Sequence, residues 1–215
     1  MLVKDFMTRN PITVAPETSF SEALKLMKQN KIKRLIVMKD EKIIGIVTEK
    51  DLLYASPSKA TTLNIWELHY LLSKLKIEEI MTKNVVTVNE NAPIEDAARI
   101  MEEKDISGLP VVDDAGRLVG IITQTDIFKV FVEIFGTKRE GTIRYTMEMP
   151  DKPGELLEVA KRIYEAGGNI ISIATLFEEG KDSYLATLRV ENIDHEKFVK
   201  SLDEIDVKLL YYHSN

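Results

Sequence analysis

Gly45-Ile46-Val47-Thr48-Glu49-Lys50-Asp51 returns 75 positions later as Gly120-Ile121-Ile122-Thr123-Gln124-Thr125-Asp126. The match continues upstream, where Phe-Met-Thr-Arg-Asn at 6–10 returns as Ile-Met-Thr-Lys-Asn at 80–84, and Thr13-Val14 returns as Thr87-Val88. A repeated sequence predicts a repeated structural unit. We therefore expect residues 4–53 and 78–128 to form two similar units.

Each unit predicts the order β-α-β-β-α over about 50 residues. The expected strands lie at 12–14, 34–38 and 43–48 in the first unit and at 85–88, 109–112 and 118–123 in the second. The expected helices cover 20–29 and 93–103, and a closing helix begins near Asp51 and near Asp126. One unit is too small to bury both faces of its helices, so we expect the two to pack around a pseudo-twofold axis.

The C-terminal third predicts a different order, β-α-β-β-α-β, which is the ferredoxin-like pattern. Its expected strands are 143–149, 170–177, 184–191 and 207–212, and its expected helices are 155–165 and 195–203. The predicted organisation is therefore repeat one at 1–54, a connecting helical segment at 55–76, repeat two at 77–135, a linker at 136–141 and a last domain at 142–215.

Composition argues against several classes of partner. The 215 residues include 29 basic and 35 acidic side chains, a net charge of −6, which disfavours nucleic acid as the main partner. There is no cysteine, and the three histidines are scattered, so we expect no metal site. No apolar run is long enough to span a bilayer, so we expect a cytoplasmic protein without a membrane partner.

The repeated unit resembles the CBS domain, and the pair resembles a Bateman module. The residues that carry this are Met81-Thr82, Gly108-Leu109-Pro110-Val111-Val112-Asp113 and the 120–126 stretch; the first copy departs at Ile36, where the family has proline. The last domain resembles an ACT domain through Asp151-Lys152-Pro153-Gly154-Glu155-Leu156 and Gly168-Asn169-Ile170. The whole order resembles the acetoin utilization protein AcuB family. These resemblances imply an α/β (α+β) fold with a CBS pair and a βαββαβ ACT domain.

The Thr-x-x-Asp motif has two interpretations. From the residues alone it is a helix N-cap, with the threonine hydroxyl accepting from a backbone N–H and the acidic residue favouring the helix start. The resemblance implies that Asp51 and Asp126 bind ribose and that Thr48 and Thr123 contact phosphate. It places Thr13, Val14, Val86 and Thr87 against the base. Both interpretations can hold together.

The clefts of the two repeats are not expected to be equivalent. Lys31, Lys33 and Arg34 could meet phosphate in the first copy, although a solvated basic turn is the favoured interpretation. The second copy has Ser107-Gly108 at the corresponding place. If both clefts bind a ligand, the cations make them different.

The ACT-like loop also has two interpretations. It can be only a turn and a helix start, since proline fixes φ and Glu155 suits a first helical turn. The resemblance implies instead an amino-acid site at a dimer interface, formed by Asp151, Gly154, Glu155, Leu156, Asn169 and Ile170.

The resulting functional prediction is a regulatory sensor and homodimer, not an enzyme. It would bind AMP, ADP, ATP or S-adenosylmethionine as a regulatory ligand, with no further cofactor, and relay binding to a partner enzyme or pathway. No reactive side chains converge in the sequence, so we expect no catalytic residue. The alternative is a dimeric scaffold without a small-molecule ligand. The sequence leaves open the ligand, the number of clefts that bind it and the client protein.

Overall fold

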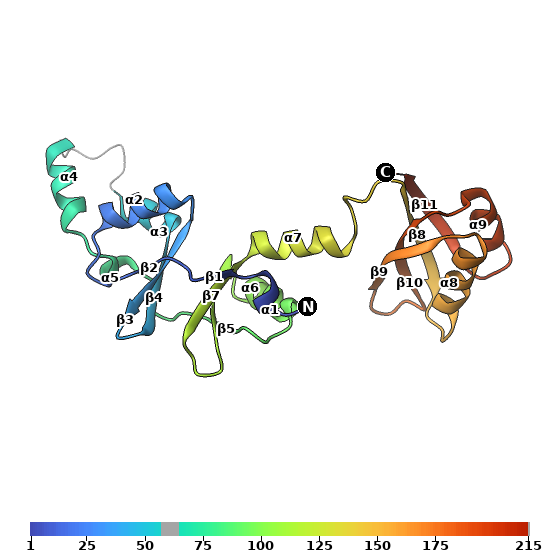
Figure 1. Cartoon of the computed structure of the whole chain (residues 1–215), viewed down its shortest axis with the longest axis horizontal. Helices are drawn as coiled ribbons and strands as arrows, with labels where there is room; N and C mark the ends of the chain where they lie inside the picture. Colours follow the sequence, from blue (N-terminus) through green and yellow to red (C-terminus); the bar gives the residue numbers. More distant parts are fainter. Residues whose placement is uncertain (57–64, 215) are drawn as a thin grey trace. The chain divides into compact units, whose positions relative to one another are not determined.

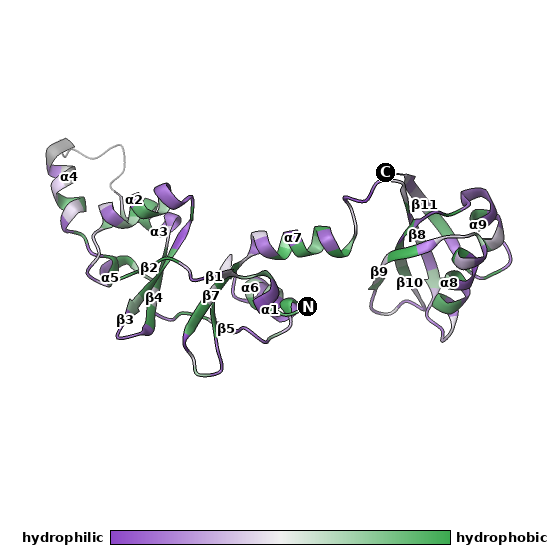
Figure 2. Ribbon diagram, viewed as in Figure 1, coloured by the Kyte–Doolittle hydropathy of each residue, from purple (hydrophilic) through white to green (hydrophobic). Residues whose placement is uncertain are grey.

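The computed structural model describes residues 1–56 and 65–214. The chain divides into two compact units, Met1–Ile127 and Phe128–Asn215 (Figure 1). Within the described residues, no helix is both long and apolar enough to cross a bilayer. Figure 2 shows the strands of both units largely in green and the connecting loops in purple, as expected of strands that form the cores.

The first repeat forms a three-stranded sheet covered by helices. Its elements are α1 (Val3–Phe6), β1 (Thr8–Arg9), β2 (Thr13–Val14), α2 (Phe20–Asn30), β3 (Arg34–Lys39), β4 (Lys42–Thr48) and α3 (Glu49–Ala55). The sheet has the order β2-β3-β4, with β3 and β4 joined as an antiparallel hairpin. Helix α2 begins where predicted, because the Ser19 hydroxyl accepts from the Glu22 backbone N–H at 3.3 Å. Its apolar side Phe20, Ala23 and Met27 is buried.

The second repeat follows the same plan. After α4 (Ile65–Lys74) come α5 (Ile77–Ile80), β5 (Val88–Asn89), α6 (Ile94–Glu103), β6 (Gly108–Val112), β7 (Leu118–Thr123) and α7 (Gln124–Ile134). The strand predicted over 85–88 is wrong in its bounds. Only Val88 and Asn89 run parallel to β6, beside Val111 and Val112, so residues 85–87 have no ladder to join.

Each repeat contributes a short extended segment that pairs with a strand of the other repeat, as the pseudo-twofold arrangement requires. Strand β1 pairs with β7 of the second repeat, and Thr82 forms the reciprocal bridge with Ile46 of β4. The methionine before each threonine packs on a glycine of the opposite repeat. A Cβ on Gly120 would overlap the Met7 sulfur, and a Cβ on Gly45 would overlap the Met81 sulfur. The two glycines therefore permit the close approach that joins the repeats.

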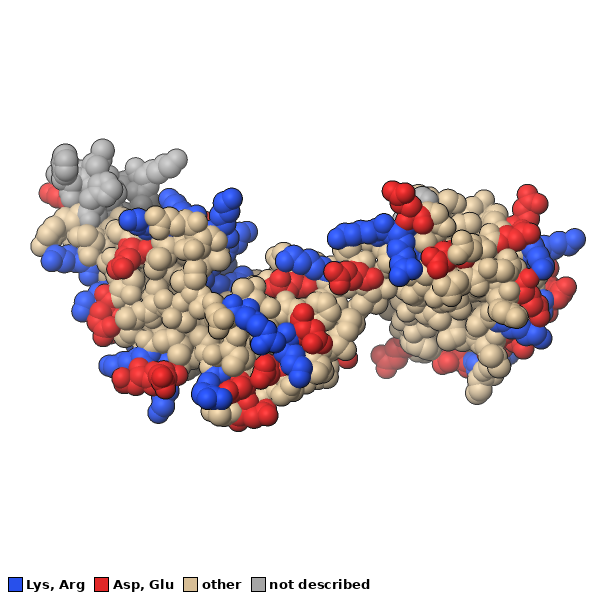
Figure 3. Space-filling view, in the orientation of Figure 1, with Lys and Arg blue, Asp and Glu red and all other residues tan. Residues whose placement is uncertain are grey.

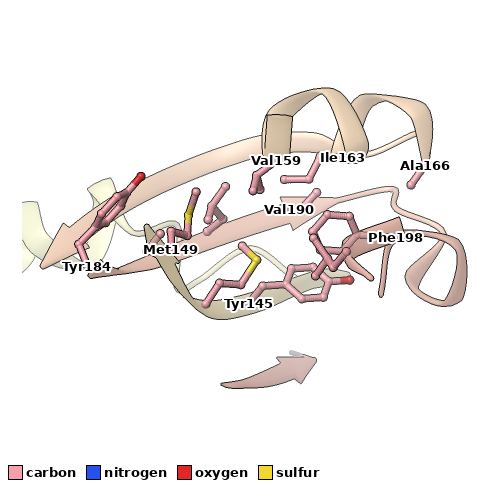
Figure 4. Close-up of a cluster of buried hydrophobic side chains, with 12 residues drawn as sticks. Tyr145, Met149, Val159, Ile163, Ala166, Tyr184, Val190 and Phe198 are labelled. Carbon is pink, nitrogen blue, oxygen red and sulfur yellow. The ribbon is translucent and has the colours of Figure 1, made fainter. Parts of the chain in front are cut away.

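The second unit is the predicted ferredoxin-like fold. It contains β8 (Thr142–Pro150), α8 (Glu155–Glu165), β9 (Asn169–Phe177), β10 (Ser183–Glu191), α9 (His195–Leu202) and β11 (Lys208–Ser214). The antiparallel sheet has the order β11-β8-β10-β9. Figure 4 shows Val159 and Ile163 of α8, Phe198 of α9 and Tyr145 and Val190 of the sheet meeting in one core, and all five are buried. Both helices thus cover the same face.

The segment predicted as a linker, residues 136–141, lies between two residues that are hydrogen-bonded to the same arginine of β10. The buried Arg189 of β10 donates from Nε to the Phe135 carbonyl at 2.8 Å and from a terminal nitrogen to the Thr142 hydroxyl at 2.9 Å. Gly136, at φ +57°, lies against Ile171, leaving no room for a side chain. Phe135 and Thr142, which flank the predicted linker, are therefore both bonded to the sheet.

Candidate functional site

The Thr-x-x-Asp motif forms a reciprocal cap in the first repeat. The Thr48 hydroxyl accepts from the Asp51 backbone N–H at 3.2 Å. Asp51 Oδ2 in turn accepts from the Thr48 backbone N–H at 2.8 Å and from the Thr48 hydroxyl at 2.7 Å. This is the capping box predicted from the residues. Within the described residues, both of these bonds are made to Oδ2, and Asp51 Oδ1 accepts none from Thr48.

The second repeat reproduces this geometry at Asp126. Its Oδ2 accepts from the Thr123 backbone N–H at 3.0 Å and from the Thr123 hydroxyl at 2.7 Å. Both carboxylates are half-buried at the start of a helix. The caps alone therefore do not distinguish the two repeats.

A cavity does distinguish them. It has a volume of about 510 Å³, within the range of small-molecule sites, and it lies between the repeats. The first repeat contributes Lys33, Arg34, Ile46, Thr48, Glu49, Lys50 and Asp51; the second contributes Thr82, Asn84, Val85, Val86, Asp105, Ile106, Ser107, Gly108, Pro110 and Gln124. The site thus combines the helix start of one repeat with the first loop and the hairpin of the other.

The structure brings together only part of the predicted nucleotide site. Thr48, Asp51 and Val86 line the cavity. The remaining predicted residues are absent from its described lining: Thr13, Val14, Thr87, Thr123 and Asp126. Val14 is instead 7% exposed and packs in the core of the first repeat.

Sequence reasoning missed several lining residues. Val85, Pro110 and Ile46 supply apolar surface, and Asn84 supplies an amide. Pro110 stood within the family-like stretch, so it could have been proposed. The contribution of one repeat to the other's cavity was not visible, because it depends on how the repeats pack.

Arg34 contradicts the solvated-turn interpretation. It is half-buried, lines the cavity and donates to the Ser107 carbonyl, and it reaches the Ser107 hydroxyl at 3.0 Å. Burial lowers the pKa of the Arg34 guanidinium, and the negative charge of Asp126 partly offsets this shift. Lys31, in contrast, is exposed at φ +53°, as a turn residue should be.

Charge in the cavity is mixed. The lining includes the cations Lys33, Arg34 and Lys50 and also the carboxylates of Glu49, Asp51 and Asp105. The face of the molecule in Figure 3 is likewise mixed, with acidic and basic side chains interspersed. The lining can therefore accept a ligand with separate cationic, neutral and anionic parts.

The predicted amino-acid site is split within one chain. Asp151, Gly154, Glu155 and Leu156 lie where β8 passes into α8, and Gly154 at φ +99° caps that helix. Asn169 and Ile170 begin β9, whose other end, Phe177, stacks on Tyr184 beside that loop. Nine strand residues separate the two groups by roughly 25 Å. Asn169 instead donates to Glu191 at 2.8 Å.

Comparison with known families decides the classification. The CBS domain model matches residues 3–58 and 77–133, and the TTHA0829-like ACT domain model matches residues 141–211. The chain belongs to the CBS domain family. More fully, it is a CBS pair followed by an ACT domain, which confirms the resemblances drawn from the sequence.

One curated relative of this CBS protein is an enzyme of much greater length. L-aspartate semialdehyde sulfurtransferase of Methanocaldococcus jannaschii is 40% identical over 131 residues, which cover 60% of this chain and 23% of that protein. The chain therefore spans about a quarter of that enzyme, and the similarity is confined to a segment the length of the CBS pair.

Three crystal structures resemble the CBS pair along nearly their whole length. The CBS pair of protein MJ0100 in complex with 5′-methylthioadenosine and S-adenosylmethionine has 36% identity and a TM-score of 0.52, covering 65% of this chain and 98% of that one. CBSX2 in complex with AMP has 34% identity and a TM-score of 0.51, covering 64% and 98%. A structure described as an acetoin utilization protein (AcuB) from Vibrio cholerae has 29% identity and a TM-score of 0.53, covering 64% and 95%.

Proposed function

We propose that this protein is a regulatory sensor that binds an adenosine-type ligand in the cavity beside Asp51. The observation that carries the proposal is the cavity itself, which places a helix-capping carboxylate, apolar side chains and cations around one space of about 510 Å³. Such a space suits a nucleoside with a charged extension. Similar CBS pairs hold AMP, 5′-methylthioadenosine or S-adenosylmethionine, which supports the proposal.

The chemistry of the lining matches the parts of such a ligand. Asp51 can accept from ribose hydroxyls through Oδ1 while Oδ2 keeps the cap. Val85, Val86 and Ile46 offer apolar surface to the flat base. Lys33 and Lys50 offer charge to a phosphate, whereas Glu49 and Asp105 offer charge to a sulfonium or ammonium group.

Isothermal titration of the full chain tests this function. AMP, ADP, ATP and S-adenosylmethionine are titrated into the wild type and into Asp51→Ala. We expect binding of at least one ligand, weakened about tenfold to a hundredfold in Asp51→Ala, because each lost bond to a charged group contributes roughly 1.5–3 kcal/mol. Asp96→Ala, an exposed carboxylate on α6 outside the cavity, is the matched control and should bind as the wild type does. The absence of any binding heat with the wild type, at ligand concentrations up to millimolar, would contradict the proposal.

We further propose that the ACT domain forms a homodimer and binds an amino acid there. The two groups of predicted residues lie at opposite ends of β9, which is an edge strand. If β9 paired antiparallel with β9 of a second copy, Asn169 of that copy would lie at the end where Gly154 and Glu155 are found. A dimer would thus assemble a site that one chain leaves divided.

A homodimeric scaffold without a ligand is the second candidate. The uncharged edge strand β9 favours dimerisation whether or not a ligand binds. Under either function we propose that the chain is not itself a catalyst and acts on a partner enzyme or pathway. The same titration separates the two candidates, since a scaffold gives no heat with any of the ligands.

A further inference from the structure

The two repeats differ at the centre of the cleft. Arg34 begins β3 and Gly108 begins β6, and the 74-residue offset of the repeat makes them equivalent positions. One repeat therefore extends a long cationic side chain toward its neighbour, and the other extends none. This difference bears on how many ligands the cleft can hold.

Arg34 reaches the helix start of the second repeat. Its guanidinium donates to the Ser107 carbonyl and lies 3.0 Å from the Ser107 hydroxyl. The same carbonyl accepts from the backbone N–H of Gln124 at 3.2 Å, and Gln124 is the first residue of α7. The cation is thus held beside the helix turn that carries Asp126.

The position is shaped for this side chain. A Cβ on Gly108 would overlap the Arg34 guanidinium, so any other residue at 108 would require the guanidinium to move from this place. The charge of Asp126 stabilises the protonated guanidinium against the cost of burial. Asp126 therefore faces a cation supplied by the chain itself.

The half of the cleft beside Asp51 is open because the second repeat has no side chain at the position equivalent to Arg34. Gly108 has no side chain to extend toward Lys33, whose carbonyl accepts from the Glu49 backbone N–H at 2.9 Å in the equivalent bond. The described cavity accordingly reaches Thr48 and Asp51, and its lining does not include Thr123 and Asp126.

We propose that Arg34 closes the Asp126 half of the cleft, so that each chain binds one adenosine-type ligand, at Asp51. This inference rests on the proposed function and specifies its stoichiometry. Replacing Arg34 by the residue of the other repeat should open a second site, which would use Asp126 as the first uses Asp51.

Equilibrium dialysis and titration calorimetry with AMP and with S-adenosylmethionine count the sites. We expect one ligand per wild-type chain and two per Arg34→Gly chain. Asp126→Ala should leave the wild-type count and affinity unchanged within about twofold, and should return the Arg34→Gly chain to one ligand. Lys31→Gly removes a neighbouring exposed cation where φ is already +53°, and it should keep one site.

The number of ligands bound by the wild type can by itself contradict the inference, so the test remains valid if Arg34→Gly does not fold. Two ligands per wild-type chain would contradict the inference that Arg34 closes one half of the cleft, and would leave the proposed function intact. One ligand per folded Arg34→Gly chain would also contradict this inference, with folding checked by a thermal melt. No binding in the wild type and in Arg34→Gly would remove the proposed function and this inference together.

Discussion

A threonine hydroxyl has one proton, and in both repeats that proton goes to the aspartate three residues later. Thr48 donates to Asp51 at 2.7 Å, and Thr123 donates to Asp126 at 2.7 Å. A phosphate contact from Thr48 would require the hydroxyl to turn away from Asp51. The phosphate role implied by the family resemblance therefore competes with the cap, whereas a ribose contact through Asp51 Oδ1 does not.

The cap of the second repeat should be separable from binding. We expect Thr123→Ala to lower the free energy of unfolding by about 1 kcal/mol, because the hydrogen bond from the Thr123 hydroxyl to Asp126 at the start of α7 is lost. Thr123 is not among the described lining residues, so AMP affinity should stay within twofold. Urea unfolding and calorimetry measure the two effects.

Thr123→Ser is the control, since it keeps the hydroxyl and should keep most of the stability. A tenfold loss of AMP affinity in Thr123→Ala, with the fold retained, would show that this threonine contacts ligand.

At the scale of elements, the joint between the repeats depends on a methionine packed on a glycine. We expect Gly45→Ala to destabilise the first unit by about 1–3 kcal/mol, because the new Cβ meets Met81 side-chain atoms. In a Met81→Ala background the same substitution should cost less than about 1 kcal/mol. Denaturant unfolding of the four proteins gives the coupling energy. Additive effects would contradict this packing.

Most elements were predictable because their local signals agree with the fold. The hairpins β3–β4 and β6–β7 and helix α8 appear where alternation and apolar spacing place them. The four-residue helices α1 and α5 and strand β1 were missed. Their formation depends on the opposite repeat, as in the pairing of Thr8 with Ile121, and local pattern contains no information on such contacts.

The candidate site was predictable only in part, because five of the eight predicted residues do not line the described cavity. Thr48, Asp51 and Val86 were identified from the motif and the family resemblance, and they do line one cavity. The inward position of Arg34 was not predicted, because a lysine- and arginine-rich turn normally lies in solvent. Only the packing of Ser107 and Gly108 against it shows that the side chain is drawn inward.

At the scale of the whole molecule, the exposed edge of the ACT sheet leads to a test of oligomeric state. All nine residues of β9 are uncharged, and edge strands that must stay unpaired usually carry charge. Ile173, 39% exposed, is the middle residue of β9 and would face its own copy in an antiparallel pair. We expect the wild type to be a dimer and Ile173→Lys to be a monomer, because the two lysines would repel each other.

Sedimentation equilibrium measures this, with Leu210→Lys as the control. Leu210 is 40% exposed on β11, the opposite edge of the sheet, and its replacement should leave the dimer intact. A monomeric wild type, or a dimeric Ile173→Lys, would contradict pairing through β9.

The hydrogen bond from Arg189 to the Phe135 carbonyl determines where a stable ACT fragment can begin. A fragment beginning at residue 142, the boundary suggested by the sequence, would keep the guanidinium and discard the carbonyl that it binds at 2.8 Å. A cation that is only 6% exposed would then lack one of its two acceptors. Expression of the ACT half alone should therefore start upstream of Phe135. The longer fragment should give a higher yield or melting temperature than the shorter one, because it keeps this bond and the contacts of Arg139 with Thr142 and Glu191.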